Sequence, residues 1–246
     1  MGAQVSIKRL NAWQIKLILV FLMVLNHLEF VYGLCSDEMI NVFIIVSRGV
    51  APMFAYLAIE GIRHTRDIKK YCMRLWIWSG IVFAGNKLLE QFLLSNAANI
   101  AAENQVYLMI RTNICFTIAA GVSFIALFEY GKKSEGVKRY LFWALSILSF
   151  GFGFMKEWGV VLMFFILVTY FARESKEYKL LGYLVVEIIA VLFRSEVYYF
   201  LVFPLIALYN GKRGPNKKIN KYFFYVFYPA HLWLIALVNY FLLTAK

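Results

Sequence analysis

Apolar residues form long continuous runs along this chain, and short polar or basic segments separate them. Runs that approach membrane-spanning length occur at about 15–33, 41–61, 71–94, 106–130, 139–155, 158–172, 178–194, 196–210 and 221–243. The pattern predicts an all-α fold, a polytopic transmembrane helical bundle with about nine spans. Eight or ten spans also fit, because the hairpins around FMKEWG and FRSEVYY are tight.

The composition supports a lipid environment for these runs. Of the 246 residues, 62% are hydrophobic and 16% are charged, and the mean hydropathy is +0.66. A soluble domain of this length cannot bury so much apolar surface. We find no internal repeat and no linker that divides the chain, so residues 1–246 are predicted to form a single transmembrane domain.

Membrane topology accounts for the net charge of +12 without nucleic acid as a partner. With a cytoplasmic N-terminus and nine spans, 20 of the 26 Lys and Arg residues fall on the inner side. The outer side keeps six of them, which are Arg48, Lys87, Arg111, Lys156, Arg194 and Lys246. Positive charge is enriched on the cytoplasmic side of membrane proteins. The asymmetry therefore predicts a cytoplasmic N-terminus, an outer C-terminus and membrane lipids as the surroundings.

The three cysteines do not suggest a crosslink or a metal site. Cys35 falls near the outer face, Cys72 near the inner face and Cys115 within a predicted helix. They differ too much in depth to pair, and they lack the spacing of metal ligands. We expect no disulfide and no bound metal.

Two polar residues stand out in the first apolar run, KLILVFLMVLNHLEF. Lys16 and His27 are eleven residues apart, which returns to within about 20° of the same helix face after a rise of about 16 Å. Lys16 would lie at the cytoplasmic headgroups and His27 near mid-membrane. An ionisable group within a span is a functional candidate because it is costly there. The other interpretation is a lysine that reaches the headgroups and a histidine bonded to a neighbouring helix.

Other polar side chains are predicted near the depth of His27. Arg48 lies about 20 Å along its helix from the inner end, and Arg111 and Asn113 fall nearer the outer face. His231, ten residues after Lys221 in FYVFYPAHLWL, also reaches mid-membrane. Polar side chains at a similar depth on four helices predict a buried cavity that opens to the outer face. Its predicted lining residues are Glu60, Arg111, Tyr228 and His231.

A basic cluster follows the second apolar run, within RGVAPMFAYLAIEGIRHTRDIKKYCMRL. Its members are Arg63, His64, Arg66, Lys69, Lys70 and Arg74. It fits a topology signal that contacts anionic lipid, or an anion-binding rim that uses the donors of Arg and Lys. Glu60 and His64 are i,i+4 neighbours that could pair with each other. No Gly-rich phosphate loop of the Walker kind occurs, which argues against an NTPase.

The basic residues at the inner surface and the polar residues at the depth of His27 together match one class of ligand. A coenzyme A thioester has phosphates at one end and a reactive sulfur at the end of a long pantetheine arm. With Lys16 and the basic cluster at the phosphates, His27 would lie about 16 Å deeper, near the thioester.

Five segments resemble successive blocks of the TraX family, small integral membrane proteins named for the acetylation of conjugative pilin. They are LVFLMVLNHLEF, SRGVAPMFAYLAIEGIRHTRDIKKYCMRL, RTNICFTIAAG, EWGVVLM and YFFYVFYPAHLWLI. The resemblance extends to the wider superfamily of transmembrane acyltransferases, in which a basic residue, ten residues and a histidine occur on the first span. It implies that His27 is essential and that an acyl-CoA donor enters from the cytosol. Asn26 stands where relatives have aspartate, and EWG stands where Asp-Tyr-Gly is expected.

These observations lead to one functional hypothesis and two alternatives. The protein is expected to lie in the bacterial cytoplasmic membrane. It would move an acetyl group from cytosolic acetyl-CoA to an amine or hydroxyl on the outer side, in a peptide such as pilin, a glycan or a lipid. His27, with Asn26 beside it, would act as the base, and Arg48 with Asn113 would stabilise the oxyanion or position the acceptor. The alternatives are a transporter of a small polar solute and an inactive scaffold; an oligomer also fits.

Overall fold

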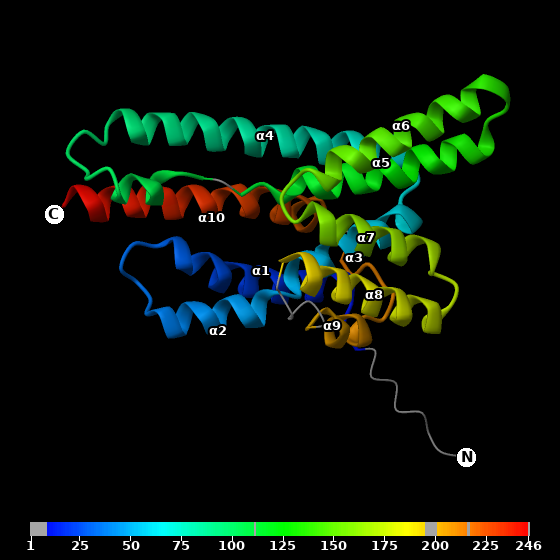
Figure 1. Ribbon diagram of the computed structural model, residues 1–246, viewed down its shortest axis with the longest axis horizontal. Coiled ribbons are helices and arrows are strands. Elements are labelled where there is room, and N and C mark those ends of the chain that lie inside the picture. The colour runs from blue at the N-terminus through cyan, green and yellow to red at the C-terminus, as the bar shows by residue number, and fades with distance from the viewer. Residues whose placement is uncertain (1–8, 111, 195–200, 216, 246) are drawn as a thin grey trace, which may run out of the picture. The chain divides into compact units, whose positions relative to one another are not determined.

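The computed structural model describes residues 9–110, 112–194, 201–215 and 217–245 (Figure 1). Within these residues the regular secondary structure is helical, apart from an isolated bridge between Leu10 and Tyr209. The predicted all-α fold is confirmed. Two compact units are built from interleaved segments, residues 1–50, 81–112 and 203–246 in the first and 51–80 and 113–202 in the second. The prediction of a single domain stays a prediction.

The helices follow most of the predicted runs. Their bounds are α1 Ala12–His27, η1 Leu28–Phe30, α2 Asp37–Ser47, α3 Val50–His64, α4 Ile68–Ser95, η2 Asn104–Leu108, α5 Ile114–Lys133, α6 Gly136–Phe154, α7 Gly159–Phe171, α8 Lys176–Arg194, α9 Val202–Leu208 and α10 Lys218–Thr244.

Four helical segments of the described chain are long and apolar enough to cross a membrane. They are Ala12–Phe30, Asp37–His64, Ile114–Lys133 and Tyr222–Thr244. α7 is apolar but has only 13 residues. Large apolar side chains are exposed on the outward faces of several helices, including Phe21, Leu88, Ile147 and Leu192. Such surfaces are rare on soluble monomers and are expected of a membrane protein.

The predicted span at 41–61 lies within the candidate span Asp37–His64, but its helix is not continuous, because the structure divides it into α2 and α3. Arg48 is the C-cap of α2 and does not lie within a continuous helix. Pro52 explains the break, because it has no amide hydrogen to donate to the carbonyl of Arg48, and in a continuous helix its ring would clash with that carbonyl. In the first turn of α3 the proline is tolerated, since the amides there have no helical partner.

Two other predicted helices also differ. The run 106–130 was expected to be one helix, but η2 ends at Leu108 and α5 begins only at Ile114. Within the first unit, the side chain of Asn86 donates to the carbonyl of Thr112 at 3.1 Å, a bond to irregular backbone that helix periodicity does not reveal. The run 196–210 lies partly outside the described residues. Its described part is the seven-residue α9, about 10 Å long and too short to cross a bilayer.

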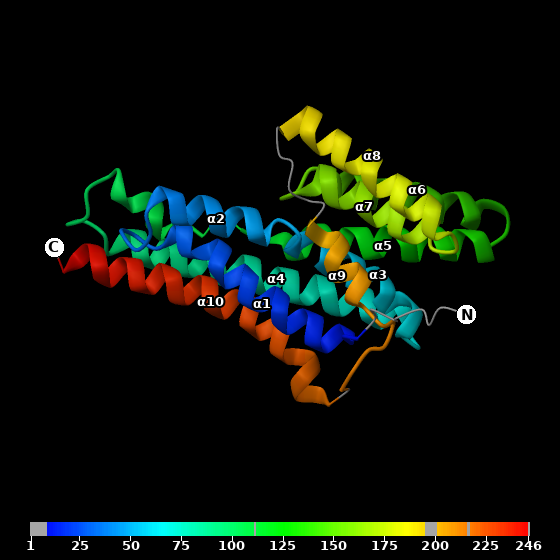
Figure 2. The same ribbon diagram turned by 90° about the horizontal axis from the view of Figure 1, so that it is seen from below.

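The first unit is organised around α1 and α10, which lie side by side (Figure 2). Asn11 starts α1 by accepting from the amides of Trp13 and Gln14, and Gln14 returns a bond to the amide of Asn11, which is a capping box. α1 and α10 run in the same direction, since Lys16 contacts Phe224 and His27 contacts His231.

Close packing joins α10 to the later part of α4 in this unit. A Cβ on Gly85 would come within 2.2 Å of the Trp233 ring, so only glycine allows the ring to lie there. The indole of Trp233 then donates to the Oδ1 of Asn86 at 2.9 Å.

The second unit contains α3, the early part of α4 and α5 to α8. α5 and α6 form a hairpin in which Ser146 donates to the carbonyl of Phe124 and Ser149 to that of Ala120. α7 and α8 pack through a Phe165–Tyr183 ring stack with centroids 4.3 Å apart. Small residues and satisfied hydroxyls at these contacts are typical of helix packing in membranes.

Candidate functional site

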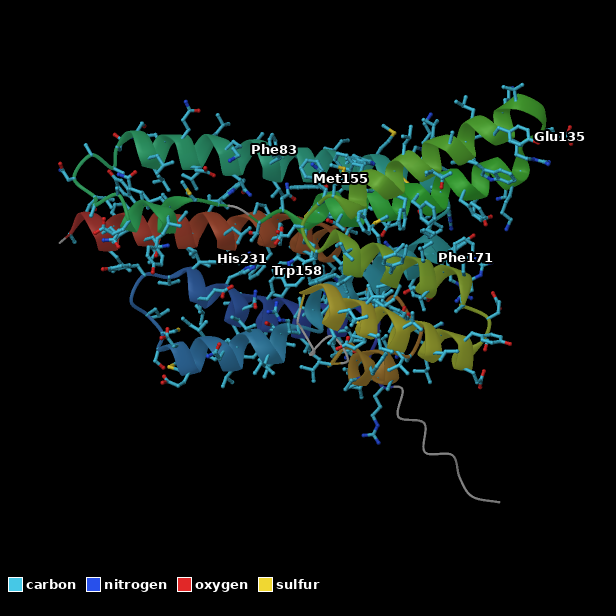
Figure 3. The ribbon with its side chains drawn as sticks, viewed as in Figure 1. Phe83, Glu135, Met155, Trp158, Phe171 and His231 are labelled. Atoms are coloured by element: carbon cyan, nitrogen blue, oxygen red, sulfur yellow. The ribbon has the colours of Figure 1, made fainter. Side chains whose placement is uncertain are left out.

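A buried pair of histidines lies between α1 and α10 in the first unit. The Nδ1 of His27 and the Nε2 of His231 are 2.6 Å apart, and their rings are nearly parallel with centroids 4.9 Å apart. Each histidine is 8% exposed. His231 extends from α10 towards α1 (Figure 3). The structure therefore brings together two predicted site residues, and His231 contacts His27 directly.

The hydrogen bonds indicate the tautomers of the two rings. The Nδ1 of His231 lies 2.9 Å from the carbonyl oxygen of Phe227. A carbonyl only accepts, so this Nδ1 carries the hydrogen, and in a neutral ring the Nε2 of His231 is then an acceptor. His27 must consequently donate its Nδ1–H to His231. The lone pair of neutral His27 is thereby placed on Nε2.

Aromatic rings surround the pair. The centroids of Phe30 and Phe227 lie 5.6 Å and 5.3 Å from the nearer imidazole, and that of Tyr228 lies 5.8 Å from His231. Tyr228 is buried, as expected of a predicted lining residue. Pro229 lies inside α10, where it removes one helical hydrogen bond close to His231. The predicted cavity itself stays a prediction.

Asn26 has a different role from the one suggested by its place beside His27. Its Oδ1 accepts from the hydroxyl of Ser47 at 2.8 Å, and Ser47 also donates to the carbonyl of Ile44. The side chain therefore links α1 to the end of α2, whereas His231 orients the imidazole. An aspartate at position 26 is not needed for that orientation.

Charged residues of the first unit lie on both sides of His27 along the sequence. Glu29 is within electrostatic range of Arg48, close to the end of α1. One turn after the start of α1, the ammonium of Lys16 lies over the ring of Phe224 at 5.4 Å. α1 is continuous from Lys16 to His27, so the predicted axial separation of about 16 Å holds.

Comparison with known proteins assigns the chain to a family. The family model described as TraX protein matches residues 12–239. The chain belongs to the TraX family. It is also 23% identical over 248 residues to the probable fimbrial assembly protein FimC, serogroup H1, of Dichelobacter nodosus, which covers 94% of this chain and 97% of the relative. No solved structure matches the chain.

The basic cluster of this TraX protein lies in the second unit, around the turn between α3 and α4. Arg63, His64, Arg66, Lys69 and Lys70 are exposed, and Arg74 is half-buried. Two of these cations have acidic neighbours, because Arg63 is 3.6 Å from Glu60 and Lys70 is 3.4 Å from Asp67. Arg74 lies over the ring of Tyr71.

Two acidic residues near this turn have structural roles. Glu60 pairs with Arg63 in the structure, whereas the sequence suggested His64. Asp67 begins α4 by accepting from the amide of Lys70, and this hydrogen bond holds the pKa of the Asp67 carboxyl below its usual range. Both carboxylates offset part of the positive charge of the cluster.

Asn113 precedes α5 in the second unit instead of lying within a helix. Its amide nitrogen donates to the carboxylate of Glu157 at 2.6 Å, and its Nδ2 donates to the carbonyl of Ser79. Burial raises the pKa of Glu157. These bonds hold the start of α5, and the oxyanion role of Asn113 stays a prediction. Arg111 lies outside the described residues.

Three polar residues of the TraX chain were not identified from the sequence. Asn239 is fully buried on α10, and Ser47 and Glu29 are the partners of Asn26 and Arg48. Glu29 and Asn239 were detectable as polar residues inside apolar runs. Ser47 was not, because a serine is common within membrane helices and its partner lies on another helix.

Proposed function

We propose that this protein is a membrane-embedded acetyltransferase that uses cytosolic acetyl-CoA. The observation that carries the proposal is the buried His27–His231 hydrogen bond, which orients one imidazole and leaves a nitrogen lone pair on it. Two stacked histidines are costly within apolar helices unless they serve a function. Membership of a family linked to pilin acetylation supports the same chemistry.

The reaction assigns a base to His27. An acceptor amine or hydroxyl attacks the carbonyl carbon of the acetyl thioester, and the Nε2 of neutral His27 takes the proton of the acceptor. The tetrahedral intermediate then collapses with cleavage of the carbon–sulfur bond. The leaving CoA thiolate recovers the proton from His27, which returns the imidazole to its neutral form. Arg48 would stabilise the oxyanion.

His231 acts in this scheme as a positioning residue. It accepts the Nδ1–H of His27 and is itself held by the carbonyl of Phe227. When His27 gains a proton, both of its nitrogens become donors, and His231 remains a suitable acceptor. The carbonyl of Phe227 thus holds neutral His231, which in turn accepts the hydrogen bond from the His27 imidazolium.

Two cationic groups, one in each unit, are separate candidates for binding the CoA phosphates. Lys16 lies about 16 Å below His27 on α1, and the cluster from Arg63 to Arg74 lies at the predicted inner surface. No metal takes part in the proposed reaction. The acceptor would be a peptide N-terminus such as that of pilin, a glycan or a lipid. The relative named as a fimbrial assembly protein favours the peptide.

The proposed orientation places the N-terminus in the cytoplasm of the cell, with the protein passing several times through the cytoplasmic membrane. α1 and α10 correspond to the first and last predicted spans, and they run in the same direction. If both cross the membrane, the total number of crossings is odd. We therefore propose an odd number of crossings.

A transporter of a small polar solute is the second candidate function. The interruption between α2 and α3 beside Arg48 favours it, since transporters often place ligands at broken membrane helices. Saturable solute flux without CoA release would support this function over acetyl transfer.

The proposed function is tested with purified protein in lipid nanodiscs and acetyl-CoA that carries a labelled acetyl group. A short pilin-type peptide with a free N-terminus serves as the acceptor, and samples with a sugar or phosphatidylethanolamine test the other classes. We expect CoA release together with transfer of the label to one acceptor. Failure to bind acetyl-CoA and to release CoA with any acceptor would contradict the proposal.

Asn26→Ala is expected to lower stability more than catalysis. Loss of its bond to Ser47 should cost about 1 kcal/mol, measured by thermal unfolding in detergent, and should lower the transfer rate less than tenfold. Ser47→Ala should have the same effect, and the double variant should be no worse than either single variant. A loss of transfer in Asn26→Ala that Ser47→Ala does not share would show that Asn26 acts on the reacting groups.

Donor binding by the basic cluster is tested with Arg66→Ala/Lys69→Ala. These two exposed side chains have no ion-pair partner among the described residues. Loss of two phosphate contacts should weaken acetyl-CoA binding about tenfold or more, measured by calorimetry in nanodiscs. The matched control is Lys132→Ala/Lys133→Ala at the end of α5. If both double variants bind acetyl-CoA with equal affinity, the cluster does not bind the donor and is only a topology signal.

A further inference from the structure

A loop of the first unit is fixed against the start of α1. Arg9 and Leu10 donate from their amides to the carbonyl of Leu208, and the amide of Asn210 donates to the carbonyl of Leu10. The amide of Ala12 donates to the carbonyl of Lys212 at 2.8 Å. The loop that follows Tyr209 is thus held by backbone bonds on both sides of Asn11.

The loop has a defined internal conformation. The Oδ1 of Asn210 accepts from the amide of Lys212, which is a turn typical of asparagine. Gly211 and Gly214 have positive φ values of 76° and 80°. A Cβ on Gly214 would come within 2.4 Å of the Oδ1 of Asn11, so this position requires glycine for two reasons.

Three cations lie on the two segments that are joined here. The loop presents Lys212 and Arg213, and both are exposed. Lys16 lies one turn above Ala12, within electrostatic range of Arg213. Like charges repel, so an anion bound among these cations would relieve the repulsion between them.

The two sequence segments that are joined here carry no acidic residue of their own. Residues 1–28 and 203–246 contain no Asp or Glu at all, whereas they hold Lys16, Lys212, Arg213 and six other Lys and Arg residues. The first turns of α1 and α10 lack acids, although a helix N-terminus favours negative charge. The cluster of the second unit differs, because Glu60 and Asp67 pair with two of its cations.

We propose that Lys16, Lys212 and Arg213 form a phosphoryl-binding site in the same unit as the histidine pair. Arg213 offers a planar fork of donors, and the two lysines add point charges. The amides at the start of α1 are already bonded to Asn11 and Lys212, so side chains make the contacts. The ligand is the nucleotide end of coenzyme A or an anionic lipid headgroup. The first source rests on the proposed function, since it puts His27 one pantetheine arm away.

The site is tested on the full chain in nanodiscs of neutral phosphatidylcholine. Adenosine 3′,5′-bisphosphate, which has phosphates but no thiol arm, is titrated by calorimetry. Lys212→Ala/Arg213→Ala should bind it at least about tenfold more weakly than the wild type. Lys132→Ala/Lys133→Ala removes the same charge elsewhere and should bind it normally. A parallel measurement counts phosphatidylglycerol molecules retained by each variant in native mass spectrometry.

A second variant tests the conformation of the loop without changing its charge. Gly214→Ala keeps all three cations but strains the loop and contacts Asn11. We expect weaker phosphoryl binding with unchanged net charge. Normal binding by Gly214→Ala would overturn a site built by this loop.

The outcomes distinguish this inference from the proposed function. Selective loss of the nucleotide in Lys212→Ala/Arg213→Ala supports the site with coenzyme A as its ligand. If the wild type binds no nucleotide and the double variant loses phosphatidylglycerol, the site stands with a lipid ligand and the acetyl-CoA function fails. Nucleotide binding that is equal in all variants overturns the site and leaves the function intact. Binding of neither probe overturns the site.

Discussion

Replacing His27 by alanine is expected to lower the rate of acetyl transfer about 10³-fold. The variant loses the nitrogen that takes the proton of the acceptor, and a positioned base contributes about 10²–10⁴-fold to such reactions. The loss should appear in kcat, with little change in the KM for acetyl-CoA, because the imidazole acts at the thioester and not at the nucleotide. The measurement is transfer of labelled acetyl groups by protein in nanodiscs.

The chain offers a matched control for this variant. Phe21→Ala removes an exposed ring from the same helix, α1, without a part in the histidine pair or the basic cluster, and it should leave kcat nearly unchanged. Thermal unfolding of each variant shows whether the protein still folds. A folded His27→Ala protein that transfers acetyl groups at the wild-type rate would remove the base from the mechanism.

Substitution of His231 separates orientation from packing. In His231→Gln the side-chain oxygen can still accept the Nδ1–H of His27, whereas His231→Ala provides no acceptor. His231→Gln should therefore keep more of kcat than His231→Ala, at similar KM. Equal loss in both variants, together with equal loss of stability, would reduce His231 to a packing residue.

Replacing Asn239 by leucine is expected to destabilise the protein by about 3 kcal/mol. Asn239 has no exposed surface, and it makes three hydrogen bonds to backbone. It accepts from the amide of Tyr32 and donates to the carbonyls of Phe30 and Tyr107. Leucine has a similar volume but cannot form these bonds, and each buried group deprived of its partner costs about 1–3 kcal/mol.

The expected change is a fall of about 10 °C in the midpoint of thermal unfolding in detergent, from the usual relation for chains of this size. Asn99→Leu is the control, because Asn99 is exposed in the loop after α4. A midpoint within 2 °C, roughly the shift for less than 1 kcal/mol, would show that Asn239 does not hold η1 and η2 to α10.

The sequence supported predictions that depend on local physics. Continuous apolar runs require helices, since in lipid a helix satisfies its own backbone hydrogen bonds. The positions of α4, α6, α7, α8 and α10 followed from this requirement. The relation of Lys16 to His27 followed from helix geometry, and both side chains do contact α10.

Some errors had causes that were visible in the sequence. Pro52 interrupts the helix in the run at 41–61 about one turn before its own position. Hydropathy does not reveal this, because it takes no account of the backbone N–H that proline lacks. The late start of α5 had no such local signal. The backbone before it is held by Asn86 in the first unit, and the amide of Asn113 by Glu157 in the second unit.

By itself, the sequence determined that this is an all-helical membrane protein of the TraX type with a histidine in its first apolar helix. The tertiary structure decided what that histidine contacts. Its partner His231 is 204 residues away in the chain, and Asn26, its neighbour in sequence, bonds to Ser47 instead. Helix periodicity determines which face a side chain occupies, but only the packing of one helix on another determines which group meets it there.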